Sequence, residues 1–288
     1  LVTNTAGTSN FRAGVNAGNS IQSGGNYNVV VGDEAGTAIT IGDSNVIVGM
    51  VAGDALTEAS DNVAVGQGAL TADTKGSKSV AIGRQALTTQ NFTSATATHN
   101  TAVGHNAGTG VTTGLNNTLI GGLAGDALED ADSNVAIGKG SLTTDRLGSY
   151  SVAVGFAALE AQIFTSATNT YNTAVGAGTG AAVTTGIQNT FVGGLAGDGS
   201  QTGTGNTALG YQSLSGVVTG GYNTALGWGA GQANTSGLNN TSVGTQALFL
   251  NTVGAYNVAM GEGALYTNVD GSQSVAIGRL ALYTQDLS

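Results

Sequence analysis

The sequence predicts an all-β protein, a parallel β-solenoid of about 15 turns. A five-residue motif, Asn or Ser, Val or Thr, a mostly small residue, an aliphatic residue and Gly, occurs fifteen times. The spacing is 17 residues, except for two gaps of 21. A fixed short period of this kind is typical of a stack in which each repeat packs on its neighbours. The anchors, counted here as position 1, are Asn28, Asn45, Asn62, Ser79, Asn100, Asn117, Asn134, Ser151, Asn172, Asn189, Asn206, Asn223, Asn240, Asn257 and Ser274.

Positions 2 to 5 predict a short strand followed by a turn. Position 2 is always Val or Thr, position 4 is always Val, Ile, Leu or Met, and position 3 is mostly Ala. This period-two alternation predicts that positions 2 and 4 point inward. The Gly at position 5 predicts a positive φ or the close approach of another backbone. The predicted core residues are Val31, Val65, Ile82, Ile137, Val154, Leu209 and Ile277.

The small residues at positions 3 and 8 predict an outward face on which identical chains pack. Ala136 and Ala208 are typical of position 3, and Leu119 and Phe191 are larger exceptions that we expect to pack against their counterparts in an oligomer. Position 9 is only Leu or Gly. We expect a second short extended segment there, with Leu pointing into the coil.

The sequence also has a longer repeat of 72 residues, since residues 62–133 match residues 134–205. Residues 28–288 therefore predict a single solenoid domain. Residues 1–27 predict an N-terminal segment with one degenerate turn, at Asn10–Gly18. The chain starts and stops within a 72-residue unit, so we expect it to be a piece of a longer protein.

Composition narrows the classes of partner. The chain has 49 Gly, no Pro and no Cys, so disulfides and thiolate metal sites are excluded. Only 8 % of its residues are charged and the net charge is −10. Nucleic acids and anionic membranes bind clustered Lys and Arg, so neither is predicted as a partner. No apolar run is long enough for a transmembrane helix, and no insertion of this segment into a membrane is predicted.

Two stretches carry a family resemblance. NTALGYQSLSGVVTGGYNTALGWGAG (206–231) and SGLNNTSVGTQAL (236–248) resemble the repeats that precede the intramolecular chaperone of phage tail-fibre and related bacterial fibre proteins. The NVAIG and SVAIG motifs more loosely resemble YadA-like trimeric autotransporter adhesin heads, whose repeat is shorter than 17 residues. The resemblance implies a left-handed β-roll in a homotrimeric rod. It also implies an extracellular location, on a cell surface or a virion tail fibre.

Two sets of residues are candidate receptor contacts. Both four-residue insertions contain the sequence Phe-Thr-Ser-Ala-Thr. A protruding loop there would present an aromatic ring to a receptor, or the ring would only cap a wider turn. Two aromatic residues at position 6 of consecutive repeats form a platform for stacking sugars, or are ordinary exposed aromatics. The candidates are Phe92, Thr93, Phe164, Thr165, Tyr211 and Trp228.

The ionisable residues predict no catalytic, cofactor or metal site. Asp54, Asp126 and Asp198 follow Ala-Gly four turns apart, too far to share an ion, and they read as solvated loop charges. His99 and His105 have no partner specified by the sequence.

The sequence therefore predicts a non-enzymatic structural or adhesive fibre segment that mediates or spaces surface attachment. Its partners would be itself and a cell-surface glycan or protein receptor. The alternatives are a polysaccharide-binding or polysaccharide-degrading tail spike, and an ice-binding β-solenoid. The ice-binding alternative comes from Thr at position 2 in seven turns, and an inward position 2 disfavours it.

Overall fold

The chain forms two compact units, residues 1–147 and 148–288. The computed structural model describes residues 6–199, 202–216 and 219–284, and these contain strands and turns but no helix. Each unit is a parallel β-solenoid. The predicted fold class, about 15 turns of a 17-residue repeat, is confirmed.

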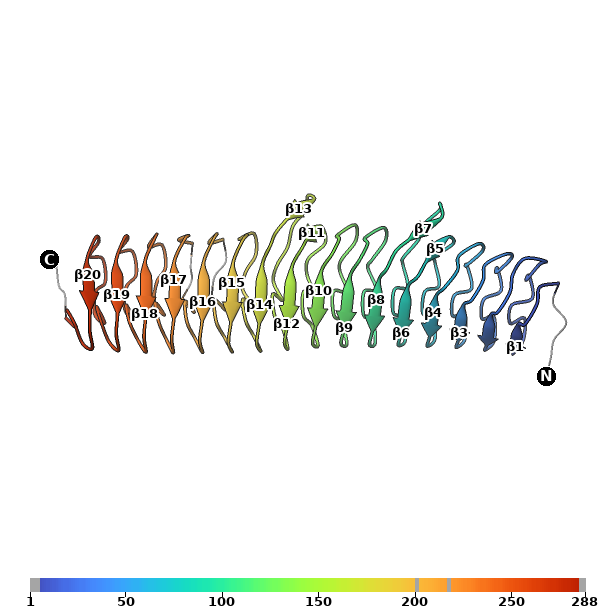
Figure 1. Ribbon diagram of the computed structural model, residues 1–288, viewed down its shortest axis with the longest axis horizontal. Coiled ribbons are helices and arrows are strands. Elements are labelled where there is room, and N and C mark those ends of the chain that lie inside the picture. The colour runs from blue at the N-terminus through green and yellow to red at the C-terminus, as the bar shows by residue number, and fades with distance from the viewer. Residues whose placement is uncertain (1–5, 200–201, 217–218, 285–288) are drawn as a thin grey trace. The chain divides into compact units, whose positions relative to one another are not determined.

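The first unit stacks one three-residue strand from each coil in chain order (Figure 1). Within it, each strand pairs in parallel with the strand one repeat later, as Val46 with Val63. Val80 pairs with Thr101, so the 21-residue gap keeps the register. The pairing of Phe11 with Val29 shows that the degenerate first turn is also a coil. The strands are β1 (Phe11–Ala13), β2 (Val29–Val31), β3 (Val46–Val48), β4 (Val63–Val65), β6 (Val80–Ile82), β8 (Thr101–Val103), β9 (Thr118–Ile120) and β10 (Val135–Ile137).

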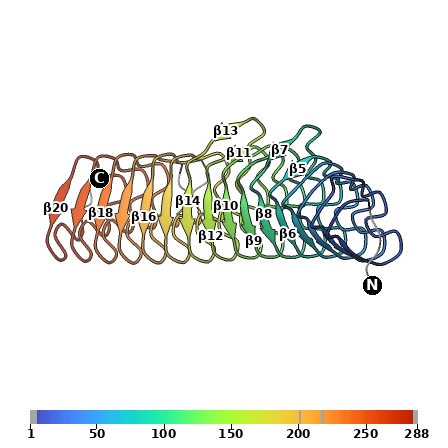
Figure 2. The same ribbon diagram turned by 45° about the vertical axis from the view of Figure 1, so that its right-hand side comes forward.

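The second unit repeats this arrangement, and Figure 2 shows its stacked coils from another side. Val152 pairs with Thr173 across the second 21-residue gap. Each insertion adds a two-residue parallel pair that projects beyond the neighbouring coils of its unit (Figure 1): β5 (Gly76–Ser77) with β7 (Thr96–Ala97), and β11 (Gly148–Ser149) with β13 (Thr168–Asn169). The main strands are β12 (Val152–Val154), β14 (Thr173–Val175), β15 (Thr190–Val192), β16 (Thr207–Leu209), β17 (Thr224–Leu226), β18 (Thr241–Val243), β19 (Val258–Met260) and β20 (Val275–Ile277).

The strands face the opposite way from the prediction. Position 3 is buried in the repeat strands, whereas positions 2 and 4 lie on the outer side, with Leu209 46 % exposed. The coil encloses so little space that its strand contributes mainly Ala to the interior, and the larger aliphatic side chains are directed outward. The predicted core was therefore wrong for Val31, Val65, Ile82, Ile137, Val154, Leu209 and Ile277, all of which are half-buried or exposed.

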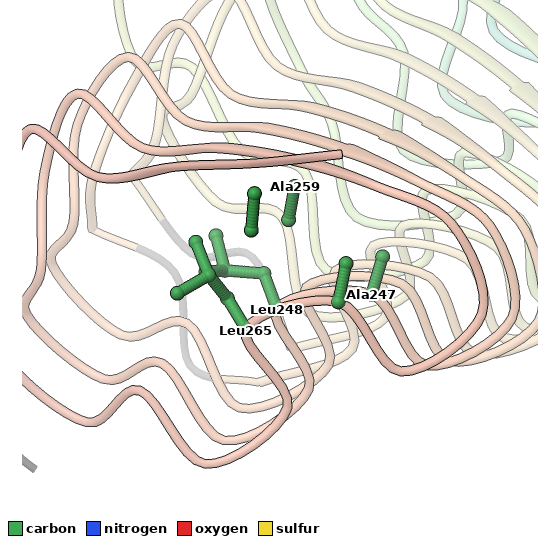
Figure 3. Close-up of a cluster of buried hydrophobic side chains, with 6 residues drawn as sticks. Ala247, Leu248, Ala259 and Leu265 are labelled. Carbon is green, nitrogen blue, oxygen red and sulfur yellow. The ribbon is translucent and has the colours of Figure 1, made fainter. Parts of the chain in front are cut away.

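The predicted outward face at positions 3 and 8 is the interior. Ala136, Ala208, Leu119 and Phe191 are buried within their own coils, so they are not contacts between chains. Figure 3 shows how Ala247, Leu248, Ala259 and Leu265 point into the space that the C-terminal coils enclose. Interior packing within one chain therefore explains the small residues.

A large side chain at position 3 occurs only with Gly at position 9. Where position 3 is Leu119, position 9 is Gly125, and a Cβ added there would lie 2.7 Å from Leu119 Cδ2. Phe191 and Gly197 form a second such pair, also at 2.7 Å. Where position 3 is Ala64, position 9 is a buried leucine. A large residue on one wall thus requires Gly on the other, because the interior is close-packed.

Backbone conformation explains both invariant turn positions. The Gly at position 5 has φ between 120° and 145°, and a Cβ at Gly66 would lie 2.5 Å from the Gly83 carbonyl oxygen. Both predicted reasons for Gly are confirmed. Position 9 has φ between 47° and 60°, whether it is Gly53 or Leu70. This segment is a turn and not the expected second strand, although Gly53 N–H still donates to the Ala69 carbonyl of the next coil at 2.9 Å.

The Asn at position 1 holds successive coils together. The side chain of Asn117 is buried, and its Nδ2 donates to the Ala131 carbonyl at 2.8 Å. Its Oδ1 accepts the backbone N–H of Asn134 at 2.9 Å. The second unit repeats this ladder, for example from Asn189 to Asn206 at 2.9 Å. The recurring Asn is therefore a buried polar spine, a role that the sequence analysis did not assign.

Candidate interaction surfaces

One regular surface in each unit is the outer sheet face, formed by positions 2 and 4 of the strands. These positions contain no charged residue in any strand. In the first unit they are mostly Val and Ile. In the second unit, position 4 is Val, Leu, Met or Ile, and position 2 is Thr in five consecutive strands. These threonines, Thr173, Thr190, Thr207, Thr224 and Thr241, are half-buried or exposed.

The protruding loops do not present their aromatic rings. Phe92 and Phe164 are each only 8 % exposed, so they cap the wider turn, and the prediction that they contact a receptor was wrong. Thr93 and Thr165 are exposed beside them and stay candidate contacts. The fully buried Asp73 anchors the first loop, because its Oδ1 accepts the Phe92 N–H at 3.0 Å.

A buried Gln replaces the Asn spine at each insertion. Position 1 is Ser79 there, and its Oγ lies 2.5 Å from the Thr98 hydroxyl of the next coil but has no direct hydrogen bond to Asn100. Gln90 bridges the gap: its Nε2 donates to Ser79 Oγ at 2.8 Å and to Asp73 Oδ2 at 2.6 Å. Its Oε1 accepts Asn100 Nδ2 at 2.8 Å. In the second unit the corresponding residues are Ser151, Gln162 and Asn172, with both side-chain contacts at 2.9 Å.

Exposed aromatic rings gather in the second unit. Tyr211 and Trp228, at position 6 of consecutive coils, are 49 % and 44 % exposed. Among the described residues, no aromatic ring stacks on either of them. Position 10 carries a stacked ladder: Phe249 and Tyr266 lie 5.0 Å apart, and Tyr266 and Tyr283 lie 4.9 Å apart, between ring centroids.

Two of the recurring carboxylates are hydrogen-bonded between coils. Asp54 Oδ1 accepts the hydroxyl of Thr71 at 2.7 Å, and Asp126 accepts the hydroxyl of Thr143. The residue 17 positions after Asp198 is Ser215, and Asp198 Oδ1 is buried without a hydrogen-bond partner among the described residues. Desolvation by burial raises the pKa of Asp198. The prediction of a solvated charge is therefore wrong for Asp198, whereas Asp54 and Asp126 are half-buried.

The remaining ionisable groups form no assembled site in the described part of the chain. His105 Nε2 lies 3.3 Å from Arg84 Nη1, and His99 is exposed. No group of three or more His, Asp or Glu side chains that could hold a metal ion occurs in residues 6–199, 202–216 and 219–284.

Comparison with known proteins finds no relatives: no protein-family model matches the chain, and no curated protein is significantly similar to it. The resemblance to tail-fibre repeats and adhesin heads therefore stays a prediction. In the described ranges there is no helix with the length and apolarity needed to cross a membrane.

Proposed function

We propose that this chain is a non-catalytic structural and adhesive segment of an extracellular or virion fibre, and that it self-associates as a homotrimer through its outer sheet face. The observation that carries the proposal is the composition of this face. Positions 2 and 4 are apolar or Thr in every strand, and Leu209 and Leu226 are 46 % and 42 % exposed. An extended uncharged apolar surface is typical of a site of protein association.

The size of the face sets a requirement on the assembly. A three-residue strand is about 10 Å long, and eight strands about 4.8 Å apart give roughly 400 Å² for one unit. A standard interface buries about 800 Å² on each partner. The sheet of one unit therefore provides about half of the area required. We expect residues of the flanking turns, or the faces of both units, to contribute.

Sedimentation of the intact chain tests the proposal. We expect a trimer at micromolar concentration, and we expect the double variant Leu209→Glu, Leu226→Glu to be monomeric with an unchanged circular dichroism spectrum. Three carboxylates would otherwise meet at each level of the interface with poor access to water. Thr245→Glu is the control, because position 6 carries Glu262 one coil later. A monomeric wild-type chain refutes the proposed self-association.

Ice binding is a second candidate function. The sequence disfavoured it because position 2 was predicted to point inward, but in the structure position 2 lies on the outer side. The five threonines of β14 to β18 lie outward and in register, at the regular strand spacing of about 4.8 Å. Position 4 beside them varies between Val, as at Val192, and Leu, as at Leu226, however, and a crystal lattice would favour a uniform column. A thermal-hysteresis assay separates the two candidates. Ice binding would be favoured if the wild-type chain sediments as a monomer and shows thermal hysteresis, and if Thr207→Tyr loses this activity.

A further inference from the structure

We propose that Tyr211 and Trp228 form a binding site for an uncharged polysaccharide on the second unit. This inference rests on the proposed attachment function, for which it names the class of ligand. It is carried by the exposure of two unstacked rings, by the polar groups around them, and by the complete absence of charge from that part of the chain.

The fold places the two rings side by side on successive coils. β16 pairs with β17, with Leu209 opposite Leu226, and each ring follows two residues later, after the Gly at position 5. The backbones that carry the rings are thus about 4.8 Å apart. The Tyr211 ring leans toward the preceding coil, where a Cβ at Gly194 would lie 3.5 Å from Tyr211 Cδ2. The rings are not stacked on one another, and about half of each side chain is exposed to a ligand.

Polar and aromatic groups lie next to Trp228. A Cβ at Gly229, the residue after Trp228, would lie 3.2 Å from Phe249 Cε2 and 3.4 Å from Gln232 Oε1, so a ring edge and an amide oxygen lie beside the backbone that carries the tryptophan. Thr245, at position 6 of the next coil, adds an exposed hydroxyl. Aromatic faces pack against the C–H face of a sugar ring, while amides and hydroxyls bond its hydroxyl groups. The surface therefore combines the two kinds of contact that a carbohydrate requires.

Charge excludes most other ligands. Residues 199–261 contain no Asp, Glu, Lys, Arg or His. The second unit as a whole carries five acidic residues and one basic residue, Arg279. An anionic ligand such as nucleic acid or a phosphorylated or carboxylated glycan would find no cation near the rings and would be repelled by the net charge. The surface therefore favours a glycan without charge.

Tyr222 and the position-10 ladder are separate from this pair. The Tyr222 ring lies over Gly205, whose added Cβ would be 2.8 Å from Tyr222 Cδ1, and it stands at the start of the strand, six residues before Trp228. In the Phe249, Tyr266 and Tyr283 ladder the ring faces cover one another. The site is therefore assigned to Tyr211 and Trp228, with the ladder as its border.

Fluorescence provides a direct test, because Trp228 is the only tryptophan in the chain. The intact chain is titrated with dextran, laminarin and galactomannan, and with alginate as an anionic probe. We expect at least one uncharged polysaccharide to shift the Trp228 emission and alginate to have no effect. In affinity electrophoresis, Tyr211→Ala and Trp228→Ala should each weaken binding at least tenfold, while Tyr222→Ala should bind as the wild type does.

Two binding results would overturn the inference: no response to any uncharged polysaccharide, or binding by the double variant Tyr211→Ala, Trp228→Ala that equals binding by the wild type. A third would be a Trp228 emission shift that depends on protein concentration in the absence of glycan. That shift would mean that a second copy of the chain covers the rings. Sedimentation of the same samples separates this from the proposed function. An intact trimer that binds no glycan refutes only the site. A monomer that binds glycan refutes only the self-association.

Discussion

Removing one amide from the Asn spine should destabilise the first unit strongly. Asn117→Ala deletes the acceptor of the Asn134 N–H, at 2.9 Å, and the donor to the buried Ala131 carbonyl, at 2.8 Å. A buried polar group left without its partner costs about 1–3 kcal/mol. Two such groups give a loss of about 2–6 kcal/mol in the free energy of unfolding, which is comparable with the whole stability of many domains.

Thr118→Ala is the matched control, since Thr118 is the next residue along the chain and lies on the outer side of β9. Its effect should stay within about 0.5 kcal/mol. Urea denaturation followed by circular dichroism measures both variants, and hydrogen exchange at the Asn134 amide shows whether the loss is local. Equal denaturation midpoints for the two variants would mean that the Asn spine does not hold the coils together.

Three further comparisons test the interior and the turns. Ala136→Arg should unfold the first unit, because a guanidinium would enter a close-packed interior, whereas Ile137→Asp should leave the coil folded and weaken only association, as thermal melting and sedimentation would show. Gly66→Ala should lower the melting temperature far more than Gly140→Ala: both have positive φ, but only the first places Cβ against backbone, and nothing lies within 4 Å at Gly140. Asp198→Asn should raise the urea midpoint at neutral pH and have little effect in acid. Burial raises the pKa of Asp198, so the charged form destabilises the fold, and this cost appears only as pH rises through the unfolded-state pKa. An equal change in the urea midpoint of Asp198→Asn at both pH values would contradict this explanation.

The strand register could be predicted from the sequence, but the direction in which the strands face could not. Alternation along a strand defines two faces without saying which one is covered. The usual preference for aliphatic interiors then favours positions 2 and 4, as at Val65 and Ile82. That preference assumes a core wide enough for large side chains. A coil of 17 residues has a core one layer thick, so Ala64 is buried inside and Val65 is half-buried on the outer side.

Some signals for the correct orientation were present in the sequence. Position 9 accepts only Leu or Gly, and the structure shows a left-handed conformation there, with leucine filling the interior in coils such as that of Ala64 and Leu70. The pairing of Leu119 with Gly125 and of Phe191 with Gly197 is visible in the repeats once position 3 is considered as an inner position. The role of Asn117 could have been inferred from the same change, because a polar residue two positions from an inner one lies on the inner face as well.

The candidate site was only partly predictable. Tyr211 and Trp228 are exposed, as the prediction required, because position 6 follows the turn out of the strand. Phe92 and Phe164 are not exposed, because the four inserted residues widen the coil and the ring fills the added space. Repeat position alone thus distinguishes surface from interior only where the coil has its standard length.

The reversed orientation changes which forces fold the chain and which would assemble it. A coil that encloses small residues and only one or two large apolar side chains releases little hydrophobic free energy, so the ladder bonds and the buried Asn spine carry a larger share of its stability than in a domain with a wide core. The largest aliphatic side chains of the strands, such as Leu209 and Leu226, stay in contact with water in the single chain. Burying them would release hydrophobic free energy only on association. Substitutions at position 3 should therefore act on folding and substitutions at position 4 on assembly, so the two processes can be altered separately within one strand.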